Sequence, residues 1–146
     1  MTKMEEMVRP KNILAPVDPD LHDLNAVHYA LALAKRIKAG VILLRREPES
    51  GFRDPKTAWM EDALADLVHN ARQAGLDVSW RLTRRVIGDE VEAMVHEEGV
   101  DIVVIGPDQR DLERRLKRIG SELAGRIIQV REKDEISNLG EGEGGA

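Results

Sequence analysis

The sequence predicts an α/β fold, with a doubly wound, mainly parallel sheet of four or five strands and helices on both faces. Two observations predict it. Short apolar runs alternate along the chain with longer segments whose apolar residues recur at three- and four-residue steps. Such alternation builds βαβ units, whose strands are parallel and whose crossovers are right-handed. At 146 residues and 42% apolar composition, the chain is long and apolar enough for one domain with its own core.

The first half of the chain predicts two buried strands with a helix between them. Residues 12–17 and 41–44 are apolar on both faces, as the central strands of a parallel sheet are. A helix is expected over residues 21–38 because its apolar residues form one stripe. The members of this stripe are Leu24, Val27, Leu31, Ala34 and Ile37.

The second half continues the alternation after a loop rich in proline and glycine at residues 45–54. Helices are expected over residues 55–74, 90–98 and 123–130, and strands over residues 78–83 and 102–105. Trp59 and Trp80 are interpreted as core anchors, since an indole ring buries a large apolar area.

The end of the sheet is left open by the sequence. A fifth strand would fall at residues 133–139, where only Ile136 and Leu139 are apolar. The sheet therefore either has a weak polar edge strand there or stops at four strands. The predicted organisation is an N-terminal arm (1–10), an α/β domain (11–131) and a weak edge strand or disordered tail (132–146).

Composition excludes several classes of protein. The chain has no cysteine, which removes disulfide frameworks and thiolate metal sites. Its net charge of −5 and 3% aromatic content argue against nucleic-acid binding, and no apolar run approaches the length of a membrane span. The histidines lack the i, i+4 spacing of a helical metal site: His22, His28, His69 and His96. No G-x-S-x-G elbow is present, so no catalytic residue is predicted.

Residues 106–121, GPDQRDLERRLKRIGS, form the segment most informative about function. They follow an expected buried strand and have a glycine at each end, which is typical of loops that hold phosphate with backbone N–H groups. The interior, however, is charged and bulky. Its five cations either bind phosphate through their side chains or form a solvated helix face paired with Asp111 and Glu113. They are Arg110, Arg114, Arg115, Lys117 and Arg118.

Three stretches of the chain resemble the universal stress protein family, over roughly residues 10–130. They are KNILAPVD at 11–18, the expected helix at 26–35 followed by Gly40, and GDEVEAMVHEEGVDIVVIG at 88–106. The resemblance implies an adenine-nucleotide alpha-hydrolase-like fold. It also implies a homodimer formed through the fifth strands, for which residues 133–139 are poor material.

The resemblance also implies where a nucleotide would bind. In members that bind ATP, an aspartate after the first strand approaches the nucleoside, and the end of the second strand contacts adenine. The phosphates lie in a loop of pattern G-x-x-G-x9-G-[ST]. The residues of this chain that the resemblance places at the nucleotide are Pro16, Asp18, Arg46, Gly106, Gly120 and Ser121. Arg110, a cation inside the loop, is added to them.

The chain departs from the family pattern at three positions. Gln109 stands at the second glycine, ten residues rather than nine separate it from Gly120, and Pro19 follows Asp18 where glycine is usual. A glutamine cannot replace a glycine that must let a ligand approach the backbone. In addition, the carboxylate of Glu122 repels a polyphosphate at the end of the loop.

We therefore expect a non-catalytic, cytoplasmic stress-response regulatory protein. In this interpretation it acts by binding an unknown regulatory protein, and no cofactor is needed. The alternative is a genuine ATP- or AMP-binding member, using Mg²⁺ and hydrolysing ATP slowly at most. We expect the protein to bind no nucleic acid and not to insert into a membrane. Arg81, Arg84 and Arg85 either join the cations of residues 110–118 in a patch for an acidic partner or only keep the protein soluble.

Overall fold

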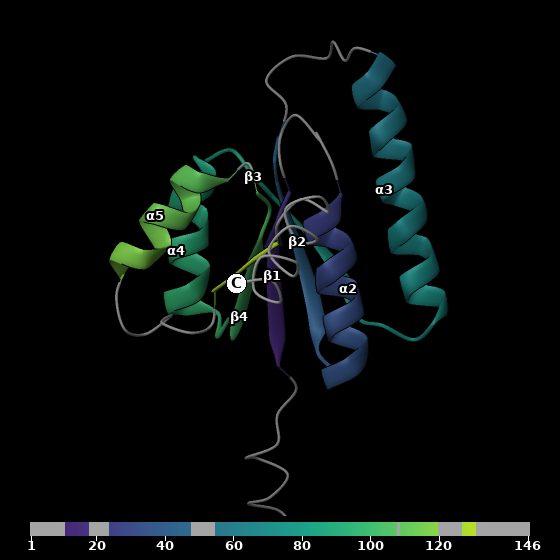
Figure 1. Cartoon of the computed structure of the whole chain (residues 1–146), viewed down its shortest axis with the longest axis horizontal. Coiled ribbons are helices and arrows are strands. Elements are labelled where there is room, and N and C mark those ends of the chain that lie inside the picture. Colours follow the sequence, from purple (N-terminus) through teal and green to yellow (C-terminus); the bar gives the residue numbers. More distant parts are fainter. Residues whose placement is uncertain (1–10, 18–23, 48–54, 108, 120–126, 131–146) are drawn as a thin grey trace, which may run out of the picture.

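The computed structural model describes residues 11–17, 24–47, 55–107, 109–119 and 127–130. Strands and helices alternate along them (Figure 1). In chain order they are β1 (Asn12–Pro16), α2 (Asn25–Ile37), β2 (Gly40–Arg46), α3 (Pro55–Gln73), β3 (Val78–Thr83), α4 (Ile87–Glu97), β4 (Ile102–Ile105), α5 (Arg110–Ile119) and β5 (Ile127–Gln129). Of the helices in this part of the chain, none is long and apolar enough to cross a membrane.

The five strands form one sheet in the order β3-β2-β1-β4-β5, and every neighbouring pair is parallel. The chain moves outward from β1 to β2 and β3, then returns to place β4 on the other side of β1. This reversal puts α2 and α3 on one face and α4 and α5 on the other (Figure 1). The predicted doubly wound fold is therefore confirmed, with five parallel strands.

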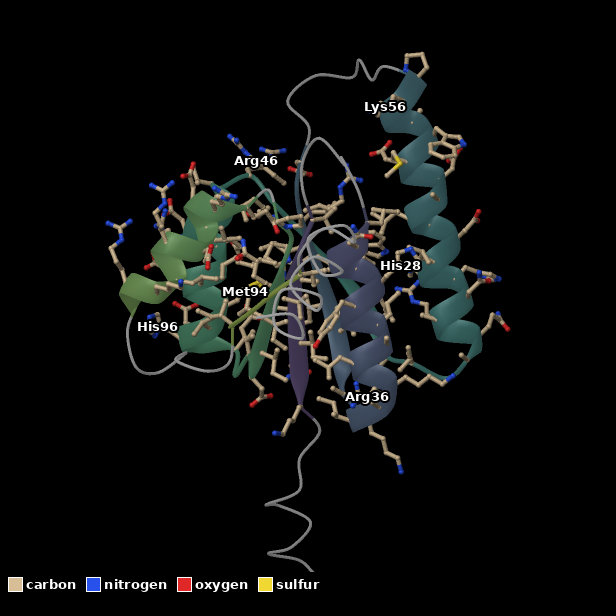
Figure 2. All side chains as sticks on the ribbon, in the orientation of Figure 1. His28, Arg36, Arg46, Lys56, Met94 and His96 are labelled. Atoms are coloured by element: carbon tan, nitrogen blue, oxygen red, sulfur yellow. The ribbon has the colours of Figure 1, made fainter. Side chains whose placement is uncertain are left out.

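Each face of the sheet has its own apolar cluster. Along β1 the side chains alternate: Ile13 and Ala15 pack with α2, whereas Leu14 packs with α4 and α5. The first cluster is the larger and continues into α3. In the second, Met94 of α4 lies fully buried against the sheet (Figure 2). Because all neighbouring strands are parallel, their carboxyl ends lie at one edge of the sheet, where a ligand site is expected.

The end of the chain differs from the prediction. Ile127–Gln129 form β5, not a helix, and pair with β4 in the register Val103↔Ile127 and Val104↔Ile128. The crossover helix is α5, inside the segment interpreted as a glycine-bounded loop, so the next element is a strand. A sheet of four strands is thus wrong. The predicted strand at residues 133–139 lies outside the described residues.

The interpretation of the two tryptophans as core anchors is wrong. Trp59 is 69% exposed and Trp80 is 38% exposed. Leu64 of α3 faces the sheet, and Trp59 lies five positions earlier, about 140° around the helix. Trp80 belongs to β3, which in the described part of the sheet is an edge strand with a neighbouring strand on one side.

Candidate functional site

The strand order reverses between β1 and β4, and the crevice outside their carboxyl ends is the usual ligand site of such sheets. Pro16 is the last residue of β1, and Gly106 follows the last residue of β4. Both positions were predicted to be site residues. The structure brings them together through a third residue, Gln109.

The side-chain amide of Gln109 lies across this crevice. The backbone N–H of Gly106 donates a hydrogen bond to Oε1 of Gln109 over 2.8 Å. The Nε2 group of Gln109 donates to the carbonyl oxygen of Pro16 over 3.3 Å. One amide therefore satisfies a backbone donor from the loop after β4 and a backbone acceptor from β1.

Backbone hydrogen bonds close the same turn. The N–H of Gln109 donates to the carbonyl of Gly106 over 3.2 Å, and the carbonyl of Gln109 accepts from the N–H of Glu113 over 2.9 Å. Gln109 thus directly precedes α5, and it forms hydrogen bonds with both the N–H and the carbonyl group of Gly106. A Cβ added to Gly106 would lie 3.7 Å from Gln109 Oε1 and 3.9 Å from Ala26 Cβ, which are ordinary contacts. Space in this turn does not require a glycine.

Arg115 joins α5 to the start of α4. Its guanidinium forms ion pairs with Glu92 and Asp89, which lie in the first half of α4. The hydrogen bond to Glu92 is the largest cause that raises the pKa of Arg115 above its ordinary value, and the hydrogen bond to Asp89 is the next. Gly88 makes room for this side chain, since a Cβ there would lie 2.8 Å from Cδ of Arg115. Arg115 therefore fixes the spacing of the two helices.

An open groove of about 940 Å³ runs between the two helices. One wall is residues 86–88, where the chain enters α4, and the other is the side of α5 that extends from Gln109 to Arg118. Cations of α5 line this second wall: Arg114, Arg115, Lys117 and Arg118. In the described part of the chain, no cluster of His, Asp or Glu side chains has the arrangement of a metal site.

Comparison with known proteins shows to which family this architecture belongs. A model of the universal stress protein family matches residues 10–129. The chain belongs to the universal stress protein family. A search of curated proteins gave no significant match.

Solved universal stress proteins share the fold at low sequence identity. One from Archaeoglobus fulgidus, in complex with dAMP, is 16% identical with a TM-score of 0.58, covering 82% of this chain and 96% of its own. A second, in complex with cAMP, is 21% identical with a TM-score of 0.54 and covers 84% and 97%. A third, from Burkholderia pseudomallei, is 17% identical with a TM-score of 0.53 and covers 82% and 95%. These likenesses concern the fold.

Within this universal stress protein fold, the other predicted site residues separate into two groups. Arg46 is exposed at the carboxyl end of β2 (Figure 2), and Arg110 is exposed at the first position of α5. Neither takes part in the hydrogen bonds that Gln109 makes. Asp18, Gly120 and Ser121 lie outside the described residues.

Sequence reasoning missed the function of two side chains. Gln109 was noted as a poor substitute for glycine, but its bonds to Gly106 and Pro16 were not predicted. The available signal was chemical, because an amide side chain carries both a donor and an acceptor and can satisfy two backbone groups. Arg115 was grouped with the anion-binding cations, whereas Asp89 and Glu92 hold it on α4.

Proposed function

We propose that this universal stress protein acts by binding another protein, in a cytoplasmic regulatory role, and that its nucleotide binding is absent or weak. The observation that supports the proposal is the Gln109 amide at the switch point. A phosphate at this position requires free N–H groups, and the N–H of Gly106 already donates to Gln109. Moreover, nothing in the site supplies a nucleophile with an adjacent base among the described residues, so the proposal includes no catalysis.

A nucleotide that enters this crevice must displace the Gln109 side chain and so break two hydrogen bonds. Each bond contributes about 0.5–1.5 kcal/mol. The displacement therefore weakens nucleotide affinity by about tenfold to a hundredfold relative to a loop with glycine at this position.

The alternative function is that of a genuine ATP- or AMP-binding member with Mg²⁺. Two observations favour it: similarly folded proteins were solved with dAMP and with cAMP, and α5 carries several cations. In this chain the alternative requires Gln109 to leave the crevice when the ligand arrives.

Isothermal titration calorimetry with ATP, ADP and AMP, each with Mg²⁺, separates the two. The wild-type chain is expected to give no binding heat at millimolar ligand and no thermal shift. Gln109→Gly is expected to gain affinity because it frees the N–H of Gly106. Gln73→Gly, an exposed position at the end of α3, is the matched control and gains nothing.

Two results would count against the proposal. Wild-type binding with a dissociation constant well below a millimolar would make the chain a nucleotide-binding member. Failure of Gln109→Gly to gain affinity, with the variant folded, would show that Gln109 is not what weakens nucleotide binding.

Self-association through β5 is a separate part of the proposal. Among the described residues this strand lies at the outer edge of the sheet, and its residues Ile127–Gln129 are half-buried. An unpaired strand edge is a template for a second copy. Light scattering at two protein concentrations tests this, with a dimer mass expected and a monomer mass at high concentration refuting it.

A further inference from the structure

We propose that the groove between the start of α4 and α5 is the docking site for the partner protein, and that the partner inserts an acidic segment with interspersed aliphatic residues. The inference rests on the proposed protein-binding function and names the partner's chemistry. Two features of the groove carry it: the cations along α5 and the apolar wall formed by residues 86–88.

The exposed side of α5 is basic although the whole chain has a net charge of −5. Arg110, Arg114, Lys117 and Arg118 follow one another at helical spacing, so their side chains project on one side of the helix. This side is defined here as the basic face. Eight residue steps separate Arg110 from Arg118, so the basic face extends about 12 Å, enough to accompany several residues of an extended peptide.

The cations of the basic face are available to a partner. Arg114 pairs with Asp111 at 3.5 Å, and both side chains are exposed, at 75% and 99%. Lys117 pairs with Glu113 at 3.1 Å within the same helix. Exposed pairs of this kind hold their members weakly. Arg118 has no ion pair with any other residue that the structure describes.

Two further exposed arginines precede residues 86–88 in the chain, although they do not line the groove. Arg84 and Arg85 directly precede Val86, and their side chains are 90% and 57% exposed. Arg84 contacts Glu47, and Arg85 contacts Glu90 at 3.6 Å. A segment lying in the groove has the cations of α5 along one side, which favours carboxylates on that side of the segment.

The wall formed by residues 86–88 is apolar. Val86 is 55% exposed, and Ile87 next to it is half-buried. An exposed aliphatic wall opposite a row of cations suits a peptide that turns aliphatic side chains toward residues 86–88 and acidic side chains toward α5. The described lining contains no aromatic ring on which a nucleic-acid base could stack, so a single-stranded nucleic acid fits this groove less well.

Fluorescence anisotropy of a short fluorescein-labelled peptide of repeated Glu-Glu-Leu units, titrated with the full chain, tests the docking site. The double variant Arg114→Glu/Arg118→Glu is expected to bind at least about tenfold more weakly. Lys35→Glu/Arg36→Glu is the matched control, because it changes the net charge equally on an exposed helix end. Arg36 lies at the end of the molecule opposite Arg46 (Figure 2). The control is expected to bind within about twofold of wild type, and raising the salt from about 50 to 500 mM weakens binding.

A second variant tests the apolar wall without weakening the fold. Val86 occupies the N-cap position of α4 and makes no capping hydrogen bond. Serine is a favoured N-cap residue, so Val86→Ser is expected to keep or raise stability. It should weaken the binding of the Glu-Glu-Leu peptide by about threefold and leave the binding of a Glu-Glu-Ser peptide unchanged. Equal effects on the two peptides would overturn the apolar part of the proposal.

Other outcomes decide against the groove as a peptide site. They are no binding of the Glu-Glu-Leu peptide, equal losses in the two charge-reversal variants, and tighter binding of oligothymidylate or ATP than of the peptide. The proposed function fails separately, through the calorimetry at Gln109. If the chain binds neither nucleotide nor peptide, only the proposed docking site is refuted. If wild type binds nucleotide strongly and Gln109→Gly binds it more strongly still, the proposed function is refuted.

Discussion

The two faces of the sheet are held to their helices by different means. On the face covered by α2 and α3, the larger apolar cluster does most of the packing, assisted by the ion pair of Arg45 with Glu61 at 2.9 Å. Burial lowers the pKa of Arg45 from its ordinary value. On the other face the apolar cluster is smaller, and arginine–carboxylate contacts connect α4 to both of its neighbours.

The contacts of α4 explain this difference. Arg81 of β3 donates to Glu98 over 2.8 Å and to Glu90 over 3.4 Å, and the hydroxyl of Thr83 donates to Glu90 over 3.0 Å. Arg115 of α5 makes the pairs on the opposite side. Exposed contacts of this kind contribute little to stability. The face that uses them is also the face that contains the groove and Gln109.

The largest expected effect compares one leucine from each face. Leu64 of α3 is 1% exposed and Leu116 of α5 is 0% exposed. Leu64→Ala and Leu116→Ala should each lower the free energy of unfolding by about 2–5 kcal/mol, measured by urea denaturation. Only Leu116→Ala should also weaken the acidic peptide, because α5 forms the basic wall of the groove. A loss of peptide binding in both variants would break the comparison.

A medium effect is expected from a double-mutant cycle at Gly88 and Arg115. In the wild-type background, Gly88→Ala should lower stability, because its Cβ pushes Arg115 away from Asp89 and Glu92. In an Arg115→Ala background the same change should stabilise α4 by about 0.5–1 kcal/mol, the helix preference of alanine over glycine. Thermal unfolding measures both.

The control background for this cycle is Arg114→Ala, on the exposed side of the same helix. There Gly88→Ala should behave as it does in wild type. If the sign of its effect were the same in the Arg115→Ala background, Arg115 would not set the spacing of α4 and α5.

The smallest expected effect is a pH dependence at Glu98. The hydrogen bond from Arg81 is the main cause that lowers the pKa of Glu98 below its ordinary 4.5. A lowered folded-state pKa means that the pair stabilises the fold above about pH 4.5 and ceases to do so as the pH falls through the folded-state value. Because the side chain is 35% exposed, screening limits the contribution to about 0.5 kcal/mol or less.

Urea denaturation at neutral and acidic pH checks this contribution. Glu98→Gln should lose less stability on acidification than wild type does. Glu97→Gln is the control, since Glu97 is an exposed carboxylate at the same helix end without a described ion pair. Parallel loss of stability in wild type and Glu98→Gln would show that the Arg81 contact does not matter.

The fold was predictable where the apolar pattern is long or continuous. The runs in β1, β2 and β4 are buried on both faces, and the stripe of α2 recurs at helical spacing, so these elements were assigned correctly. Residues 127–130 were not, since a short apolar run has no period that separates strand from helix. The helix α5 was hard to see because only Leu112 and Leu116 of its described side chains are apolar and buried.

The candidate site was predictable in place but not in detail. The topology alone implies that Pro16 and Gly106 meet at the switch point. The conformation of the Gln109 side chain depends on the distance between two strand ends, which no local pattern encodes. Likewise, the exposure of Trp80 follows from the position of β3 at the sheet edge, and the sequence of β3 resembles that of a strand with one packed face.

The exposure of the two tryptophans has a practical consequence for spectroscopy. Trp59 and Trp80 are the only tryptophans of the chain, and both indoles already contact water in the folded protein. Their native emission is therefore expected near the wavelength of solvated indole and will change little on denaturation. Neither lines the groove, so intrinsic emission will not report ligand binding there. Circular dichroism and extrinsic labels are the appropriate probes.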